Sequence, residues 1–367
     1  MLDAVKAMLA WSVLLAALLT AGCRSPRLPD VCRILLGSAA QNDGGTPAGD
    51  NTAVEPETKS ESGDAYARGC ALLYGEGVER DSEEALRLLR AAGEQGHLNA
   101  QITLGLLFMN GGADVSKDAA EAVKWLELAA RQGNVMSQGC LGALYLAKDT
   151  PTPVRDPEAG VVWLKRAGTG GDVTAQAALG LMYGKGYVVA QNDIESVRWN
   201  RMAADQGNAD AQTRLGIAYY RGHGVERSYD EALKLFRSAA AQGQAAAMSN
   251  LGVMTAKGEG IDKDEKAALD WFRKAAEAGD GDGQSNLGAA YHQGAGVAQS
   301  YAEALKWFTL AAEQGHALAQ FRLGYMYAHG QGVEADAAKA AEWIGKAAAQ
   351  GNTLALKWLR EHSVSDQ

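Results

Sequence analysis

The sequence predicts an all-α fold, a solenoid of about eight helix-turn-helix repeats that are each about 36 residues long. Three observations predict it. The pair Leu-Gly recurs at a nearly fixed interval, a Gly-x-Gly turn follows most of these pairs, and a second apolar stripe with helical spacing follows each turn. A fixed interval of 20 to 50 residues is typical of stacked repeats, in which each unit buries its apolar face against its neighbours.

Residues 1–22 are expected to be a signal peptide. The apolar run Ala7–Leu19 is shorter than the roughly 20 residues of a membrane-spanning helix and has the length of a signal-peptide core. The small residues that follow it, and then Cys23, resemble the lipobox of bacterial lipoproteins, a family in which the Cys thiol is acylated and the Cys becomes the new N-terminus. Thr20 departs from that motif, because the usual Leu comes one residue earlier, at Leu19. An ordinary secretory peptide or a single-pass anchor is the alternative.

Residues 23–63 are expected to form a flexible tether after the acylated Cys23. The stretch 41–63 consists mostly of Gly, Asp, Glu, Ser and Thr and has too few apolar residues to fold alone. A flexible coil of this length spans on the order of 35 Å. The tether would therefore hold the repeats clear of a membrane surface.

Residues 64–352 are expected to contain the eight repeats. The recurring mid-helix glycine follows a Leu in all copies but the first, and the steps after the second copy are 37, 38 and then 36 residues. A glycine inside a helix costs about 1 kcal/mol relative to Ala, so its recurrence predicts close approach of a partner helix that a side chain would block. The eight glycines are Gly69, Gly105, Gly142, Gly180, Gly216, Gly252, Gly288 and Gly324.

The fifth copy shows the parts of one repeat. Residues 211–220 place apolar side chains at helical spacing. Gly222 and Gly224 can adopt the left-handed conformations that end a helix and turn the chain. Ser228 or Asp230 can then cap the second helix.

Aromatic residues occupy two repeated positions. The first lies three residues after the glycine, at Tyr145, Tyr183, Tyr219, Tyr291 and Tyr327, with Phe108, Leu72 and Thr255 in the other copies. The second lies in the second helix, at Trp125, Trp163, Trp199, Trp271, Trp307 and Trp343, with Leu89 and Leu235 in the other copies. Periodic aromatic residues of this kind indicate core packing rather than a ligand platform.

The combined pattern A-x-x-x-L-G-x-x-Y-x-x-G-x-G-V, followed by D-x-x-x-A-x-x-W-x-x-x-A-A-x-x-G, resembles the Sel-one-like repeat family. These repeats are relatives of the tetratricopeptide repeats with a slightly longer unit. The resemblance implies a right-handed α/α superhelix with a concave groove and an adaptor or assembly role for a protein or peptide partner. It also implies, from some bacterial members, a role in the envelope, in secretion, in exopolysaccharide export or in host contact.

Two copies depart from this pattern. The second copy has one extra residue in its turn, at 110–115, and lacks the second glycine. The third copy replaces the turn with the Pro-containing segment 146–157, and its second helix ends in the Gly-rich segment 168–171. The third turn is either a specialised loop, a bend between two groups of repeats, or drift in a tolerant surface turn. After the last repeat, residues 353–367 are expected to form a capping helix and a frayed tail.

The sequence shows no arrangement of residues that points to catalysis, a cofactor or a metal. It has no nucleophile or phosphate-binding motif, no His pair at metal-ligand spacing, and no C-x-x-C. Two repeats separate Cys70 from Cys140, beyond the reach of a disulfide. The cysteine pairs of the secreted relatives that are linked to β-lactam binding are therefore absent. The net charge of −9 does not favour nucleic acid as a partner.

The variable residue before each Leu-Gly pair is the remaining candidate site. In the last four copies it is Arg214, Asn250, Asn286 and Arg322. If first helices line the inner wall, these side chains form a polar ladder that can bind a peptide backbone. Ordinary solvated helix residues are the alternative.

The sequence therefore predicts a non-enzymatic, lipid-anchored scaffold of the bacterial envelope, with the membrane contacted through its anchor. No small-molecule substrate is expected. Arg24 follows the anchoring cysteine, and by resemblance to diderm lipoproteins this favours the outer membrane, facing the periplasm. A cell-wall enzyme or binder, active on peptidoglycan or β-lactams, and a structural spacer are the alternatives.

Overall fold

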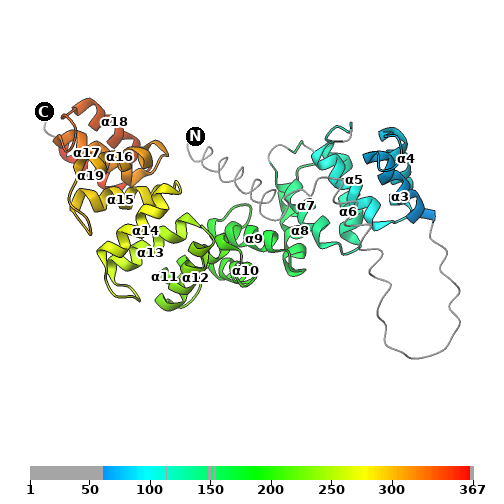
Figure 1. Ribbon diagram of the computed structural model, residues 1–367, viewed down its shortest axis with the longest axis horizontal. Helices are drawn as coiled ribbons and strands as arrows, with labels where there is room; N and C mark the ends of the chain where they lie inside the picture. The colour runs from blue at the N-terminus through cyan, green and yellow to red at the C-terminus, as the bar shows by residue number, and fades with distance from the viewer. Residues whose placement is uncertain (1–60, 113, 148–149, 152–153, 364–367) are drawn as a thin grey trace. The chain divides into compact units, whose positions relative to one another are not determined.

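A computed structural model describes residues 61–112, 114–147, 150–151 and 154–363. These residues form 17 helices and no strands, which confirms the all-α repeat fold (Figure 1). The expected signal peptide, Cys23, most of the tether and the last residues of the tail lie outside the described residues. The helices are α3 (Glu61–Tyr74), α4 (Ser82–Glu94), α5 (Leu98–Asn110), α6 (Ala119–Arg131), α7 (Val135–Leu146), α8 (Pro157–Thr169), α9 (Val173–Lys185), α10 (Asp193–Asp205), α11 (Ala209–Arg221), α12 (Tyr229–Ala241), α13 (Ala245–Lys257), α14 (Glu265–Glu277), α15 (Gly281–Gln293), α16 (Tyr301–Glu313), α17 (Ala317–His329), α18 (Ala337–Ala349) and α19 (Thr353–Ser363).

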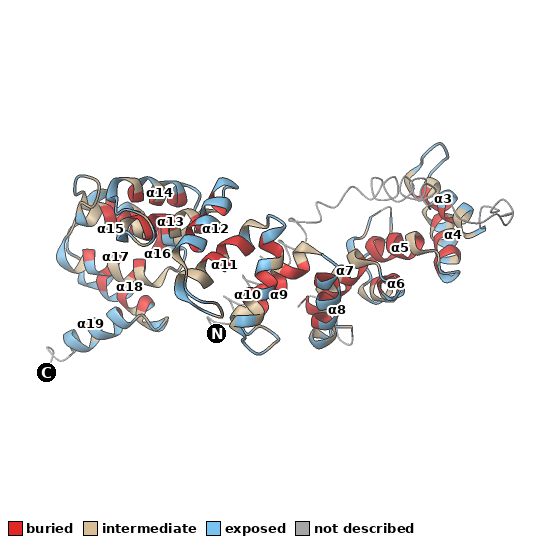
Figure 2. Cartoon of the chain, turned by 90° about the horizontal axis from the view of Figure 1, so that it is seen from below, coloured by how far each residue is buried: buried red, intermediate tan, exposed pale blue. Residues whose placement is uncertain are grey.

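The chain divides into two compact units, Met1–Ala203 and Ala204–Gln367. Outside the fourth repeat, whose second helix α10 contains the division, the first and second helix of a repeat pack against each other, and the second helix also contacts the first helix that follows it. Buried residues line the helix faces that meet, and exposed residues cover the outer faces (Figure 2). The division falls within α10, so it does not coincide with the third turn.

The repeated mid-helix glycine lies where the two helices of a repeat approach most closely, as its recurrence predicts. A Cβ atom on Gly288 would lie 2.7 Å from Phe308, and one on Gly216 would lie 2.7 Å from Phe236. Real Cβ atoms essentially never approach a neighbour this closely. The glycine therefore makes room for a large side chain of the second helix to be buried.

The prediction that Leu89 holds the Trp position of the first repeat is wrong. Leu89 packs against Gly69, in the place that Leu126 takes against Gly105, and Leu126 is the residue after Trp125. The extra residue in the second copy's turn shifts the spacing between its two helices by one. Leu88 therefore holds the Trp position in the first repeat.

The six repeated Trp side chains belong to the core, as expected. Three are buried and three are half-buried against the apolar clusters of the second unit. The Gly-rich end of α8 has a packing reason, because a Cβ on Gly168 would lie 2.9 Å from Trp199. Gly93, at the end of the first repeat, makes the same room for Trp125 of the second repeat.

Turns and caps follow the sequence closely. Gly222 and Gly224 have φ angles of 74° and 69°, in the left-handed region. Ser228, rather than Asp230, caps α12 by accepting a hydrogen bond from the Glu231 backbone N–H.

His97 and His316 stand where other repeats place Asn or Asp, and both act as helix caps. Nδ1 of His97 accepts a hydrogen bond from the Ala100 N–H at 3.2 Å, and Nδ1 of His316 accepts one from the Ala319 N–H at 3.1 Å. A ring nitrogen must be unprotonated to accept, and burial lowers the pKa of His97, which keeps that ring neutral. These two histidines therefore have structural roles.

The third turn is ordered by local hydrogen bonds in its described part. Thr150 Oγ1 donates to the Leu144 carbonyl at 2.7 Å, and the Val154 N–H donates to the Pro151 carbonyl at 2.8 Å. Pro157 is the first residue of α8, where its missing N–H costs nothing. A binding role for this loop stays a prediction.

The fourth turn contains a strained residue, and relieving the strain is expected to stabilise the protein. Val188 stands where other turns have their second glycine and has a φ angle of 64°. The left-handed region costs a residue with a Cβ about 1–2 kcal/mol, and a β-branched side chain is a genuine outlier there. Val188→Gly should therefore raise the free energy of unfolding by about 1 kcal/mol after the added chain entropy of Gly is subtracted.

Urea unfolding followed by circular dichroism measures this effect. The control is Val189→Gly in the same turn, because Val189 packs against an apolar cluster and should lose stability when truncated. A lower urea midpoint for Val188→Gly than for the wild type would contradict the expected strain.

Candidate functional site

The four ladder residues lie in the second unit, at one register of four successive first helices. Arg214 is on α11, Asn250 on α13, Asn286 on α15 and Arg322 on α17, and each is half-buried. We call these four residues the polar stripe. Helices α13 and α15 contact each other directly, so at least these neighbouring members come from adjacent helices.

The members of the stripe differ in how they are held. Asn250 Nδ2 donates to the Ala246 carbonyl of its own helix at 2.7 Å. Burial lowers the pKa of Arg214, and the carboxylate of Asp210, one turn earlier, acts in the opposite direction. Asn286 is half-buried on α15.

Arg322 reaches across to the neighbouring first helix. Its Nη1 donates to the Ser285 carbonyl at 3.1 Å and to Ser285 Oγ at 3.3 Å, and its guanidinium carbon lies 5.5 Å from the centre of the Phe308 ring. Burial lowers the pKa of Arg322. Leu318 occupies the position that Asp210 has relative to Arg214, so no acid one turn earlier balances this charge.

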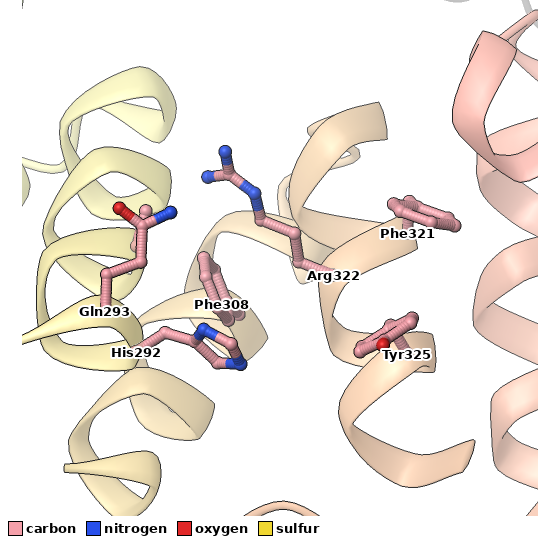
Figure 3. A pocket seen from close by; sticks show the side chains of 7 residues that line it. His292, Gln293, Phe308, Phe321, Arg322 and Tyr325 are labelled. Carbon is pink, nitrogen blue, oxygen red and sulfur yellow. The ribbon is translucent and has the colours of Figure 1, made fainter. Parts of the chain in front are cut away.

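A pocket of about 220 Å³ lies beside Arg322, between α15 and α17 and above the second helix α16. Figure 3 shows Arg322 projecting between the two first helices, with Phe308 and His292 below it and Phe321 and Tyr325 on the opposite side. The pocket is thus largely apolar and aromatic, with one guanidinium at its edge. It is lined by Ala289, His292, Gln293, Phe308, Phe321, Arg322 and Tyr325.

The aromatic wall of this pocket extends along α17. The Tyr325 ring stacks on the His329 ring with centres 4.0 Å apart, and it lies 6.3 Å from the Phe321 ring. Tyr325 is 37% exposed, which is high for a large apolar side chain. On the opposite wall, His292 Nε2 is held by Gln331 Oε1 at 2.8 Å.

Sequence reasoning found Arg322 but missed the aromatic residues around it. Phe321 stands where the three preceding copies have Thr or Ser, and Tyr325 stands where they have Ile, Val or Ala. A comparison of registers between copies could have identified both. Both residues lie outside the two periodic aromatic positions.

The described part of the chain contains no cluster of three or more His, Cys, Asp or Glu that could hold a metal ion. None of its helices is long and apolar enough to cross a membrane. Of the cysteines, Cys70 is buried in the first repeat's core, and Cys140 is half-buried against the apolar side chains of α6 and α7.

The chain matches the model of the Sel1 repeat eight times. The matched segments are residues 65–97, 98–134, 141–172, 173–208, 209–244, 245–280, 281–316 and 317–352. Each match from the fourth to the eighth covers one first helix and one second helix. A comparison with curated proteins gives no match.

Two solved bacterial structures are similar over most of the chain. A Sel1 repeat protein from Oxalobacter formigenes is 34% identical with a TM-score of 0.66, over 95% of this chain and 93% of the other. A protective antigen of uropathogenic Escherichia coli strains, with an SLR fold, is 34% identical with a TM-score of 0.61, over 80% of this chain and 70% of the other. With eight matched repeats and these relatives, the chain belongs to the Sel1 repeat family.

Proposed function

We propose that this protein is a scaffold that binds an extended segment of a partner protein along the polar stripe. Sel1 repeat proteins are generally non-catalytic and bind protein partners. The observation that carries the proposal is the repeated placement of half-buried amide and guanidinium groups at one register of α11, α13, α15 and α17. Such groups donate hydrogen bonds to backbone carbonyls without regard to the partner's side chains.

The spacing of the stripe fits an extended chain. Packed helices lie about 8–10 Å apart, and an extended chain advances about 3.3 Å per residue. One stripe member would therefore meet about every third residue of the partner. Asn250 keeps its side-chain carbonyl oxygen to accept a partner N–H while its amide nitrogen is held by Ala246.

Binding measurements on the full chain test this proposal. Partner segments recovered by crosslinking in the native envelope would be synthesised as peptides and titrated by fluorescence anisotropy. Replacing Asn250 and Asn286 together by Ala should weaken binding about tenfold or more, because each lost hydrogen bond contributes about 0.5–1.5 kcal/mol. The control replaces the exposed Glu277 and Glu313 of the second helices by Ala. Equal affinities for the two double variants would reject the stripe as the binding surface.

We also propose that the scaffold is tethered to the bacterial envelope through acylated Cys23, on the periplasmic side of the outer membrane. The support is the lipobox-like segment that ends in Cys23 and the bacterial source of both similar structures. A single acyl chain anchors only weakly, so stable attachment requires more than one chain.

Lipid labelling tests the anchor. Cys23→Ser should abolish incorporation of radiolabelled palmitate and release the protein from the membrane fraction. Cys32→Ser is the control, because it removes a nearby thiol and leaves the lipobox-like segment intact. Palmitate incorporation that persists in Cys23→Ser would contradict acylation at this residue.

A further inference from the structure

The pocket beside Arg322 has the size of a subsite rather than of a small-molecule site. Small-molecule and cofactor pockets usually measure about 300–1,000 Å³, whereas this one measures about 220 Å³. That volume suits one amino-acid side chain or one chain end.

The charge of the pocket is positive and only partly balanced. Within the described part of the chain, Arg322 uses Nη1 for both of its hydrogen bonds, which leaves the donors on Nε and Nη2 for a ligand. Both acceptors on Ser285 are uncharged, and the ring of Phe308 supplies a weak interaction with the cation. A half-buried guanidinium with remaining donors favours a planar anion that accepts two hydrogen bonds.

The apolar walls restrict the ligand further. Phe308, Phe321 and Tyr325 are among the residues that line the pocket, so the group that carries the anion gains by being apolar or aromatic. One guanidinium balances the single charge of a carboxylate, whereas a phosphate monoester carries about −1.5 to −2 at neutral pH. A carboxylate is therefore the better match.

We propose that this pocket binds a carboxylate joined to an apolar or aromatic group, presented by the partner segment. The carboxylate is either the C-terminus of the partner or the side chain of an Asp or Glu next to an apolar residue. This inference rests on the proposed function, since it assigns Arg322 as the specificity-determining member of the stripe. Arg214, at the same register, has Asp210 beside it and is assigned no such role.

Three labelled eight-residue peptides, titrated against the full chain, test this assignment. The first ends in Phe with a free carboxylate and contains no Asp or Glu, the second is amidated and carries a Glu beside the Phe, and the third is amidated and has no acidic residue. The third should bind at least tenfold more weakly than whichever of the first two binds best. Preference for the first identifies a chain end, and preference for the second identifies an acidic side chain.

Four variants separate the role of Arg322 from a general loss of folding. Arg322→Gln should abolish the preference for the carboxylate peptides, and Arg322→Lys should keep part of it, because Lys keeps the charge but lacks the planar pair of donors. Tyr325→Ala removes a partly exposed wall of the pocket. It should lower the affinity for the Phe-containing carboxylate peptides without changing the melting temperature. Arg214→Gln is the matched control. Because Arg214 belongs to the stripe but not to the pocket, this variant should lower the affinity for all three peptides to a similar extent and leave the preference unchanged.

The outcomes distinguish this inference from the proposed function. Equal binding of all three peptides, or an unchanged preference in Arg322→Gln, overturns the pocket assignment. The stripe remains supported in that case if replacing Asn250 and Asn286 lowers the affinity for all three peptides. If no peptide binds, saturation-transfer NMR is carried out with millimolar N-acetylphenylalanine and with its amide. A contact that is seen with the acid, but not with the amide and not in Arg322→Gln, supports the pocket while the proposed function fails. No contact with the acid overturns both.

Discussion

Replacing Gly296 by Ala is expected to destabilise the second unit by about 2–4 kcal/mol. Gly296 has a φ angle of 70°, so any Cβ there costs about 1–2 kcal/mol. The Cβ would also run into the Glu265 backbone carbonyl and lie 2.9 Å from the Lys266 backbone nitrogen. Backbone atoms at a helix start cannot move aside as a flexible side chain can, and overpacking typically costs about 1–3 kcal/mol.

The matched control lies in the same turn. Gly294 has a φ angle of 76°, but a Cβ on it would have no neighbour closer than 3.5 Å. Gly294→Ala should therefore show the conformational cost of about 1–2 kcal/mol alone. Urea unfolding gives the difference between the two variants, and hydrogen exchange should place the additional loss in the sixth and seventh repeats. Equal losses would mean that the contact with Glu265 has no energetic weight.

The contact at Gly296 recurs in the neighbouring repeats. A Cβ on Gly260 would lie 2.7 Å from the Tyr229 Cβ, and one on Gly332 would lie 2.7 Å from the Tyr301 carbonyl carbon. In each case the second turn glycine meets the start of the preceding second helix. This glycine thus has two roles, because it both turns its own chain and allows the preceding repeat to pack against it.

The sequence predicted the first of these roles but not the second. A left-handed turn is a local property that a Gly-x-Gly pattern reveals, whereas contact with the preceding repeat depends on how the helices pack. The packing role of the mid-helix glycine was predictable from the sequence, because a glycine inside a helix costs stability and its recurrence there requires a packing explanation. The prediction for Leu89 was wrong because it too depended on how the helices pack. A single inserted residue changes the spacing between two helices without changing either helix.

The candidate site was predictable only in part. Arg214 and Arg322 have the same residue type and the same register, and the stripe could be listed from the sequence. Their surroundings differ. Asp210 lies one turn before Arg214, whereas Leu318 lies one turn before Arg322, with Phe321 and Tyr325 nearby on the same helix. That contrast is present in the sequence, but the joining of Phe308 from another helix to the same pocket required the structure.

Replacing Phe308 by Ala is expected to cost about 3–5 kcal/mol, the usual range for removing a buried aromatic ring. Phe308 is 1% exposed, fills the space that Gly288 leaves open, and lies beneath the Arg322 guanidinium. The variant should therefore be less stable, and it should also bind the carboxylate peptides more weakly under conditions where it is still folded. Urea unfolding and fluorescence anisotropy measure the two effects separately.

Phe272→Ala separates the core role of the ring from its role in the pocket. Phe272 has the same register in the preceding repeat, packs against Gly252 as Phe308 packs against Gly288, and does not line the pocket. It should lose a comparable amount of stability while the preference for carboxylate peptides stays at the wild-type level. If both variants lost that preference equally, binding would depend on the stability of the unit as a whole. A loss confined to Phe308→Ala would show that one position of a repeated core has acquired a second task, because the eighth repeat places Arg322, Phe321 and Tyr325 above it.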